Sequence, residues 1–320
     1  MLSSSLQARS GGPYAPNTAS LGGLPSVIPD IPVCAVLMAF YIGFAATNMT
    51  ILRINSCRGH KFILSGLLFG FCMARIVTLV LRIAWATRQH NISLAIAASI
   101  LVNAGVLLVF IINLILAQRI LRAKQPHFGW HWIERIGSKV LYALIAGALI
   151  MVITSSVVSM YTLNAHTRSQ CRKVQLAAIT YFLVFTCLPL LHVLAAVMLP
   201  RSSREESFGQ GPTATKVAIV TASSCLCIII AGFKAGINWS PPRPMTNPAW
   251  YHSKAAFFVF TFVPEILALF ILTMSRIDKR FHVPNGSTKP GDYSGDYSGW
   301  TQSSSEGGKE DMDAQRKTSQ

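Results

Sequence analysis

Long apolar runs separated by short polar stretches occupy most of the chain between residues 32 and 275. A bilayer core of roughly 30 Å is crossed by about 20 helical residues, and seven of the runs reach that length. A helix suits this setting because it satisfies its own backbone polar groups without water. The pattern therefore predicts an all-α integral membrane protein, a seven-transmembrane helix bundle with spans at about 32–52, 62–86, 92–117, 139–161, 174–199, 217–237 and 255–275.

The composition supports a membrane environment. Apolar residues make up 52% of the 320 positions, charged residues only 12%, and the mean hydropathy is +0.45. Soluble domains carry about 25% charged residues. So few charges cannot cover a soluble surface, which excludes a cytosolic enzyme, a disordered protein and a disulfide-rich secreted domain. Acidic residues are scarcest, and before position 275 they are limited to Asp30, Glu134, Glu205, Glu206 and Glu265.

The basic residues indicate an orientation. The net charge is +16, but the basic residues fall in short clusters between apolar runs. This pattern favours anionic lipid headgroups, not nucleic acid, as the charged partner. The connections after the first, third and fifth spans, together with the start of the tail, hold twice as many Lys and Arg residues as the opposite side. The positive-inside rule then predicts an outer N-terminus and a cytoplasmic C-terminus.

Three regions follow from this pattern. Residues 1–31 are expected to form a flexible outer arm, residues 32–276 the helix bundle, and residues 277–320 a disordered cytoplasmic tail. The tail is rich in Gly, Ser, Asp and Lys, and it repeats the tetrapeptide Asp-Tyr-Ser-Gly in tandem from residue 292. Such a composition cannot bury a core, which is the reason for expecting disorder.

Two charged residues, Arg75 and Glu265, are predicted to pair near the middle of the membrane. They occupy similar depths in the second and seventh spans, and Glu265 is the only acid expected inside a span. An unpaired charge there costs several kcal/mol, whereas an arginine–carboxylate pair recovers much of that. Pro264 frees a backbone carbonyl beside the pair. Both a static staple between helices and a gating or ligand-facing pair fit this pattern.

Arg82 and Lys234 are expected in the outer half of the second and sixth spans. Long basic side chains at this depth either reach out to the headgroups or line an outward-facing vestibule that binds anions. His192 in the fifth span is expected to bond to a neighbouring helix, with a proton relay as the alternative.

The connection at 238–254 is predicted to fold over the outer mouth of the bundle as a lid. Its four prolines prevent a helix, and Trp239, Trp250 and Tyr251 provide an apolar underside. Interfacial anchoring of these aromatic residues is the alternative. Asn91 and Asn238 each begin an Asn-x-Ser glycosylation signal on the side assigned outside.

Signals for catalysis, cofactors and metals are weak. His127 and His131 have a metal-ligand spacing but no third ligand nearby, so we expect neither a metal nor a cofactor. The motifs of membrane hydrolases and metalloenzymes are absent from the sequence, which favours a protein that is not an enzyme. Cys34 and Cys171 both fall on the side assigned outside, where a disulfide between them is an open alternative.

Four blocks of sequence carry a family resemblance: RGHKFILSGLLFGFCMAR at 58–75, QRILRAKQPHFGW at 118–130, PPRP with PAWYHSK between 241 and 254, and RFHVP with PGDYS between 280 and 294. They resemble a fungal seven-transmembrane family of uncharacterised function, often labelled family C-like G-protein-coupled receptor. The resemblance implies a receptor-like sensor of unknown ligand in the plasma membrane, with a G protein or another cytoplasmic partner. A lipid or small-molecule translocator of the fungal seven-span resistance type is the alternative.

Overall fold

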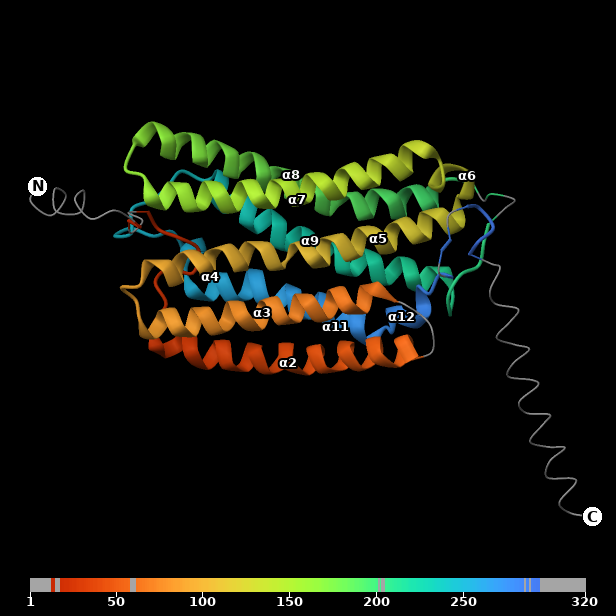
Figure 1. Ribbon diagram of the computed structural model, residues 1–320, viewed down its shortest axis with the longest axis horizontal. Coiled ribbons are helices and arrows are strands. Elements are labelled where there is room, and N and C mark those ends of the chain that lie inside the picture. Colours follow the sequence, from red (N-terminus) through yellow and green to blue (C-terminus); the bar gives the residue numbers. More distant parts are fainter. Residues whose placement is uncertain are drawn as a thin grey trace, which may run out of the picture.

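The computed structural model describes residues 13–14, 18–57, 62–200, 202, 205–284, 286–287 and 289–293. Within these residues, seven helical segments are long and apolar enough to cross a membrane. All of them run along the long axis of the molecule (Figure 1). The predicted fold, an all-α multi-pass membrane protein with seven spans, is confirmed.

The helices have the following bounds. The first six spans are α2 (Val27–Cys57), α3 (Ile63–Thr87), α4 with α5 (Ile92–Gly105 and Leu107–Lys124), α7 (Trp132–Tyr161), α8 (Ala165–Met198) and α9 (Thr213–Trp239). The seventh consists of α10 (Lys254–Phe257), the π-helical turn η2 (Phe258–Phe262) and α11 (Val263–Met274). The short elements between and after the spans are α6 (Pro126–Gly129), the 3-10 turn η1 (Trp250–His252) and α12 (Ile277–Arg280).

The two ends of the bundle carry different short elements. We call the end that holds α6 and α12 the C-terminal end, and the end that holds η1 and the start of α2 the N-terminal end (Figure 1). Figure 1 shows α2 and α3 on one side of the bundle, α7 and α8 on the other, and α5 and α9 between them. An odd number of spans places the beginning and the end of the bundle on opposite sides of a membrane.

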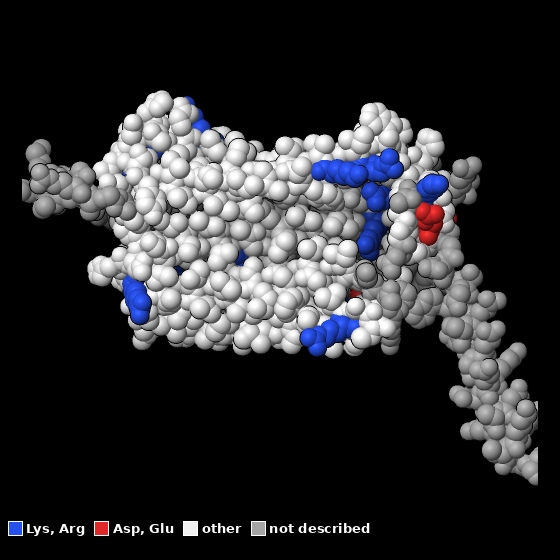
Figure 2. Space-filling view, viewed as in Figure 1, with Lys and Arg blue, Asp and Glu red and all other residues white. Residues whose placement is uncertain are grey.

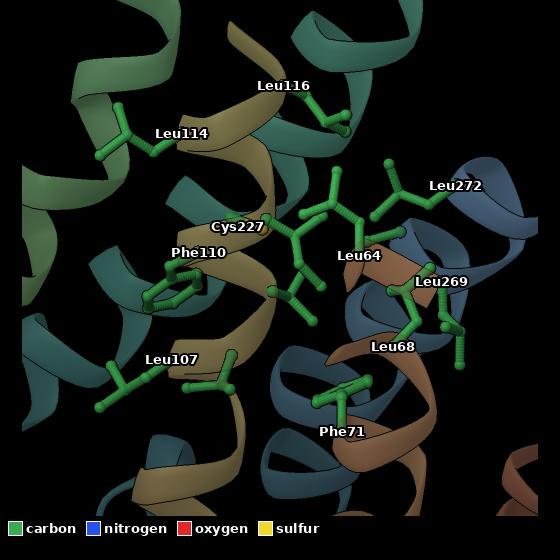
Figure 3. Packing of buried hydrophobic residues seen from close by; sticks show 14 of the residues in the cluster. Leu64, Leu68, Phe71, Leu107, Phe110, Leu114, Leu116, Cys227, Leu269 and Leu272 are labelled. Atoms are coloured by element: carbon green, nitrogen blue, oxygen red, sulfur yellow. The ribbon is translucent and has the colours of Figure 1, made fainter. Parts of the chain in front are cut away.

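Helix α5 forms the centre of the packed core. It contacts α3, α8 and α9, and its side chains Ile112, Leu114 and Leu116 are fully buried. Figure 3 shows side chains from α3 and α11 packed beside α5, among them Leu68 and Leu269. Because lipid is as apolar as these side chains, the helices are held by close packing and by polar contacts, not by a difference in hydrophobicity.

Several helices begin earlier than the apolar runs indicate. Helix α8 begins at Ala165, where Asn164 caps it by accepting a hydrogen bond from the backbone N–H of His166 at 2.9 Å. Its first turns contain the basic residues Arg168 and Arg172. A hydropathy pattern marks only the part of a helix that lies in hydrocarbon, so it misses a helix that continues into the polar region.

Two irregular segments lie in the middle of the bundle. The third span breaks at Val106, between α4 and α5. The seventh span contains the π-helical turn η2, which is followed by Val263 and then by Pro264, a residue that has no N–H to donate. Breaks and π-turns leave backbone carbonyls without their usual helical partners and occur frequently at functional sites.

Two predicted region boundaries need correction. Helix α2 begins at Val27, so residues 27–31 belong to the bundle and not to a flexible arm. The described part of the tail is packed and not disordered, since Phe281 is fully buried and Tyr293 is only 3% exposed. Single residues anchor both segments: the buried Asp30 lies in the first, and the buried Phe281 and Tyr293 lie in the second. The second Asp-Tyr-Ser-Gly copy lies outside the described residues.

Candidate functional site

The predicted ion pair between Arg75 and Glu265 is present. The Arg75 Nη2 atom lies 2.5 Å from Glu265 Oε1, and both side chains are almost completely buried. The second carboxylate oxygen of Glu265 accepts a hydrogen bond from the hydroxyl of Tyr41 at 3.2 Å. The pair therefore joins α2, α3 and α11 in the middle of the bundle.

Arg75 also bonds to the break in the third span. Its Nη1 atom donates to the carbonyl oxygens of Leu101 at 3.3 Å and Val102 at 3.1 Å. The guanidinium lies against Gly105, where an added Cβ would approach its central carbon to 3.2 Å. The carbonyls beside the helix break thus solvate the buried arginine, and the glycine gives it room.

Lys234 belongs to the same cluster. Its Nζ atom donates to the carbonyl oxygen of Val102 at 3.0 Å, the oxygen that also accepts from Arg75. The side chain is 9% exposed, and within the described residues no carboxylate forms an ion pair with it. We call Arg75, Lys234 and Glu265 the core charge cluster. It holds two cationic groups and one acid.

The expected vestibule formed by Arg82 and Lys234 is not seen, because Arg82 has its own partner. Its Nε and Nη2 atoms bond to Asp30 Oδ1 at 3.0 and 2.7 Å, and Lys254 Nζ lies 2.6 Å from the other carboxylate oxygen. The guanidinium also lies over the ring of Phe257, 4.2 Å from its centroid. Arg82 is therefore a buried staple at the N-terminal end, and neither snorkelling nor a vestibule describes it.

Asp30 is the residue that the sequence analysis missed. The sequence predicts a flexible arm at this position, yet Asp30 is fully buried within α2, so Glu265 is not the only acid inside a span. The signal that points to it is the same scarcity argument: Arg82 needs an acid at the N-terminal end, and Asp30 is the acid nearest to that end of the first span.

The aromatic residues of the predicted lid do not form a buried underside. Trp239 and Trp250 are 61% and 70% exposed, while His252 is the buried side chain of η1. Trp250 packs edge-on against Tyr251 at 5.9 Å between ring centroids. The exposed rings agree with the alternative of interfacial anchoring.

The remaining predicted residues have separate surroundings. His192 bonds to a neighbouring helix as expected, with Nε2 3.0 Å from Glu134 Oε1. Asn91 is exposed and caps α4, whereas Asn238 donates from Nδ2 to the carbonyl of Lys234, so its amide is engaged in its own helix. All seven cysteines lie within the described residues and are free, which excludes the Cys34–Cys171 disulfide in this structure.

A second polar site closes the C-terminal end of the bundle. The carboxylate of Glu206 accepts backbone hydrogen bonds from Gly291 at 2.6 Å and Tyr293 at 3.0 Å. The backbone N–H of Glu206 donates to the carbonyl of Ala123 near the end of α5 at 2.9 Å. One acidic residue therefore ties the tail to the connection before α9 and to α5.

Aromatic packing completes this closure. The ring of Tyr293 lies 5.5 Å from that of Trp130 and 5.8 Å from that of Phe208, and Phe208 also packs against Phe281. Burial raises the pKa of the Tyr293 phenol, although Arg122, which bonds to it, acts in the opposite direction. We call Glu206, Phe208, Phe281 and Tyr293 the end seal.

The end seal is joined to α5, which begins after the break in the third span, and to α11, which carries Glu265. Arg119 of α5 donates from Nη1 to the carbonyl oxygen of Phe281 at 2.6 Å. Helix α11 begins next to Glu265 and leads through α12 to Phe281. Both α5 and α11 thus extend from the irregular middle of the bundle to the end seal.

Surface charge agrees with a membrane-spanning middle. In Figure 2, Lys and Arg residues gather toward the two ends of the visible face, with most of them at the C-terminal end, and the broad band between is almost free of charge. Such a band is what lipid tails would cover. The basic C-terminal end is the one that the positive-inside rule assigns to the cytoplasm.

Comparison with known proteins gives one result. The chain matches the family model described as "Protein of unknown function (DUF3112)" over residues 126–216. This stretch contains α6, α7, α8 and the connection to α9, and with them Glu206 and Phe208 of the end seal. It contains no member of the core charge cluster. No curated protein and no solved structure matches the chain.

Proposed function

We propose that this multi-pass membrane protein is a receptor-like sensor, not an enzyme, with its N-terminus outside and its C-terminus in the cytoplasm. The carrying observation is the end seal: the chain's own tail covers the end of α5 through Glu206 and Tyr293. A sensor at rest needs a cytoplasmic face that is closed to its partner and can open. A G protein is the partner that the sequence resemblance implies.

The irregular helices support a switch. The core charge cluster lies where the third span is broken and where the seventh contains a π-turn, so small changes in charge there act on segments with weak helical bonding. Helix α11, which carries Glu265, and helix α5, which begins directly after the break, both extend to the end seal. A helix packed in a protein core transmits a shift from one of its ends to the other, because the packed core around it is not continuously deformable.

The test uses the tail. A variant that ends at residue 284 lacks Gly291 and Tyr293 and therefore opens the seal, whereas a variant that ends at residue 299 keeps both. The amount of heterotrimeric G-protein α subunit that co-purifies with each is compared with that of the wild type. We expect about tenfold more with the 284 variant, and its release by a non-hydrolysable GTP analogue.

A point variant gives the same test in the full-length chain. Glu206→Ala removes the carboxylate that holds both tail amides, and it should act like the shorter chain. If no variant shows association that depends on the nucleotide, the G-protein receptor function is wrong. Transfer of lipid across vesicles by the purified wild type would then favour the translocator.

A further inference from the structure

The buried core holds one cationic group more than its acid can neutralise. Both oxygens of Glu265 have other partners, Arg75 for one and the Tyr41 hydroxyl for the other, and within the described residues Glu265 forms no ion pair with Lys234. Lys234 is left with the carbonyl oxygen of Val102, which it shares with Arg75. A carbonyl solvates a cation only in part, and an uncompensated charge in a low-dielectric interior is costly.

Donor atoms in this cluster are also unfilled. Among the described residues, Arg75 Nε is buried and has no hydrogen-bond partner. The ammonium of Lys234 carries three protons, of which the contact to Val102 uses one. Two cationic groups that share one acceptor thus present further N–H groups to the same part of the core.

The walls of this region are apolar and aromatic. The guanidinium of Arg75 lies 5.5 Å from the ring centroid of Phe71 and 5.7 Å from that of Phe262. A small number of precisely placed polar groups in apolar surroundings is typical of small-molecule sites. Lys234 retains 9% exposure and Arg75 none, so a ligand would arrive past the lysine.

We propose that the core charge cluster binds a monoanion, a carboxylate or a halide, between Arg75 Nε and Lys234 Nζ. This proposal names a ligand class for the proposed sensor. It rests on the proposed function only where it calls the anion the sensor's ligand. Binding itself is measured on the purified chain without any cytoplasmic partner. Failure of anion binding and failure of G-protein coupling are therefore separate results.

The experiment follows thermal unfolding of the full-length protein in detergent at constant ionic strength. A thiol-reactive dye reports unfolding because Cys34, Cys72, Cys171 and Cys227 are buried in the folded state. Sodium gluconate, whose anion is too large and too strongly hydrated for the core, is replaced stepwise by sodium chloride, acetate or hexanoate. We expect a saturable rise in Tm of about 5 °C with at least one of them.

The three arms identify the source of the anion, and the variants identify the site. A rise with chloride alone indicates a halide, and a rise with acetate or hexanoate indicates a carboxylate. Lys234→Met should abolish the rise, and Lys234→Arg should keep it. Lys173→Met is the matched control, because Lys173 is exposed on α8, and it should behave as the wild type. A wild-type Tm that is the same in all salts, or a rise that persists in Lys234→Met, would overturn the proposal.

Discussion

Three ionisable side chains, Arg75, Lys234 and Glu265, share the middle of the bundle, and their charges do not balance. The consequence of losing each one depends on the charge that is left behind. Loss of the acid leaves two buried cations, loss of Arg75 leaves a lysine and a carboxylate, and loss of Lys234 leaves a balanced pair. The three losses are therefore not equivalent.

We predict a fixed order of stability among the neutral variants. Glu265→Gln should lower the free energy of unfolding by about 3–5 kcal/mol, because it strands both cations. Arg75→Gln should cost less, about 1–3 kcal/mol, since Lys234 remains as a counter-charge. Lys234→Met should be as stable as the wild type within about 1 kcal/mol, or more stable. Thermal unfolding in detergent measures the order.

Equal destabilisation by the Glu265, Arg75 and Lys234 substitutions would contradict this predicted order. It would show that Lys234 does not share the electrostatics of the pair. The double variant of Arg75 and Glu265 completes a thermodynamic cycle, and strictly additive losses in that cycle would show that the two residues do not interact.

The sequence predicted part of this cluster, for a physical reason. Arg75 and Glu265 lie in the middle of clear apolar runs, so depth and charge scarcity were sufficient to pair them. Lys234 was assigned to the outer half, since sequence gives its depth but not the direction in which its side chain reaches. Asp30 was missed because Pro29 and Pro32 around it are typical of a loop.

At the scale of elements, the junction of α11 and α12 depends on Arg276. This residue has a φ of +51°, the left-handed region in which glycine is usual. Its side chain compensates by binding Asp278 through two bonds of 3.0 Å, from Nε and Nη2. Asn55 at the end of α2 donates to the same carboxylate at 3.3 Å. Asp278 thus fastens α12 to the first span.

The contacts of Asp278 predict that the free energy of unfolding depends on pH. Burial acts to raise the pKa of this carboxyl, but the bonds from Arg276 and Asn55 outweigh it and hold the pKa below its usual value. A lowered folded pKa means that the stabilisation is present near neutrality and is lost as the pH falls below about 4. Asp278→Asn should therefore cost about 1–2 kcal/mol at pH 7 and much less at pH 3. Unfolding followed by tryptophan fluorescence tests this, and an equal difference at both pH values would contradict it.

The close approach of Gly209 to the backbone of Arg280 leads to a prediction about how the end seal is attached. The φ of Gly209 is +55°, and an added Cβ would lie 2.0 Å from the carbonyl oxygen of Arg280, a backbone atom that cannot turn away. Gly286 has a φ of +87°, but among the described residues no atom lies within 4 Å of the added Cβ, so it is a matched control. Gly286→Ala should lower the free energy of unfolding by about 1 kcal/mol. Gly209→Ala should lower it as well and should also release the end seal. Proteolysis of the tail should accelerate only in Gly209→Ala; equal rates in both variants would refute the contact.

The elements themselves were largely predictable from the sequence, but the end seal was not. Seven apolar runs of sufficient length determine seven spans, because lipid demands helices of that length. The seal depends on single residues in polar segments, such as Glu206 and Tyr293, and their pairing is decided by backbone contacts far apart in the chain. No local periodicity records such contacts.

For the molecule as a whole, the orientation is the first property to test. The excess of basic residues at the C-terminal end predicts that this end lies in the cytoplasm. In sealed, intact cells, a tag at residue 320 should be protected from protease and a tag at residue 10 should be cleaved. The reverse pattern would place the end seal outside and remove the basis of a cytoplasmic partner.

The sensor function requires that the core charge cluster and the end seal form one switch. Lys234 is the excess charge in the closed core, so its removal should stabilise the closed state and with it the seal. The helices that join the two sites, α5 and α11, make this a long-range effect. A substitution that preserves overall stability is needed, because a destabilised variant would open everywhere.

Hydrogen exchange of the Gly291 and Tyr293 amides, both bonded to Glu206, measures this coupling directly. In the Lys234→Met variant, we expect both amides to exchange at least about fivefold more slowly than in the wild type. The Lys173→Met control should leave them unchanged. Identical exchange in Lys234→Met and the wild type would show that the core and the seal are independent, and would contradict the proposed sensor.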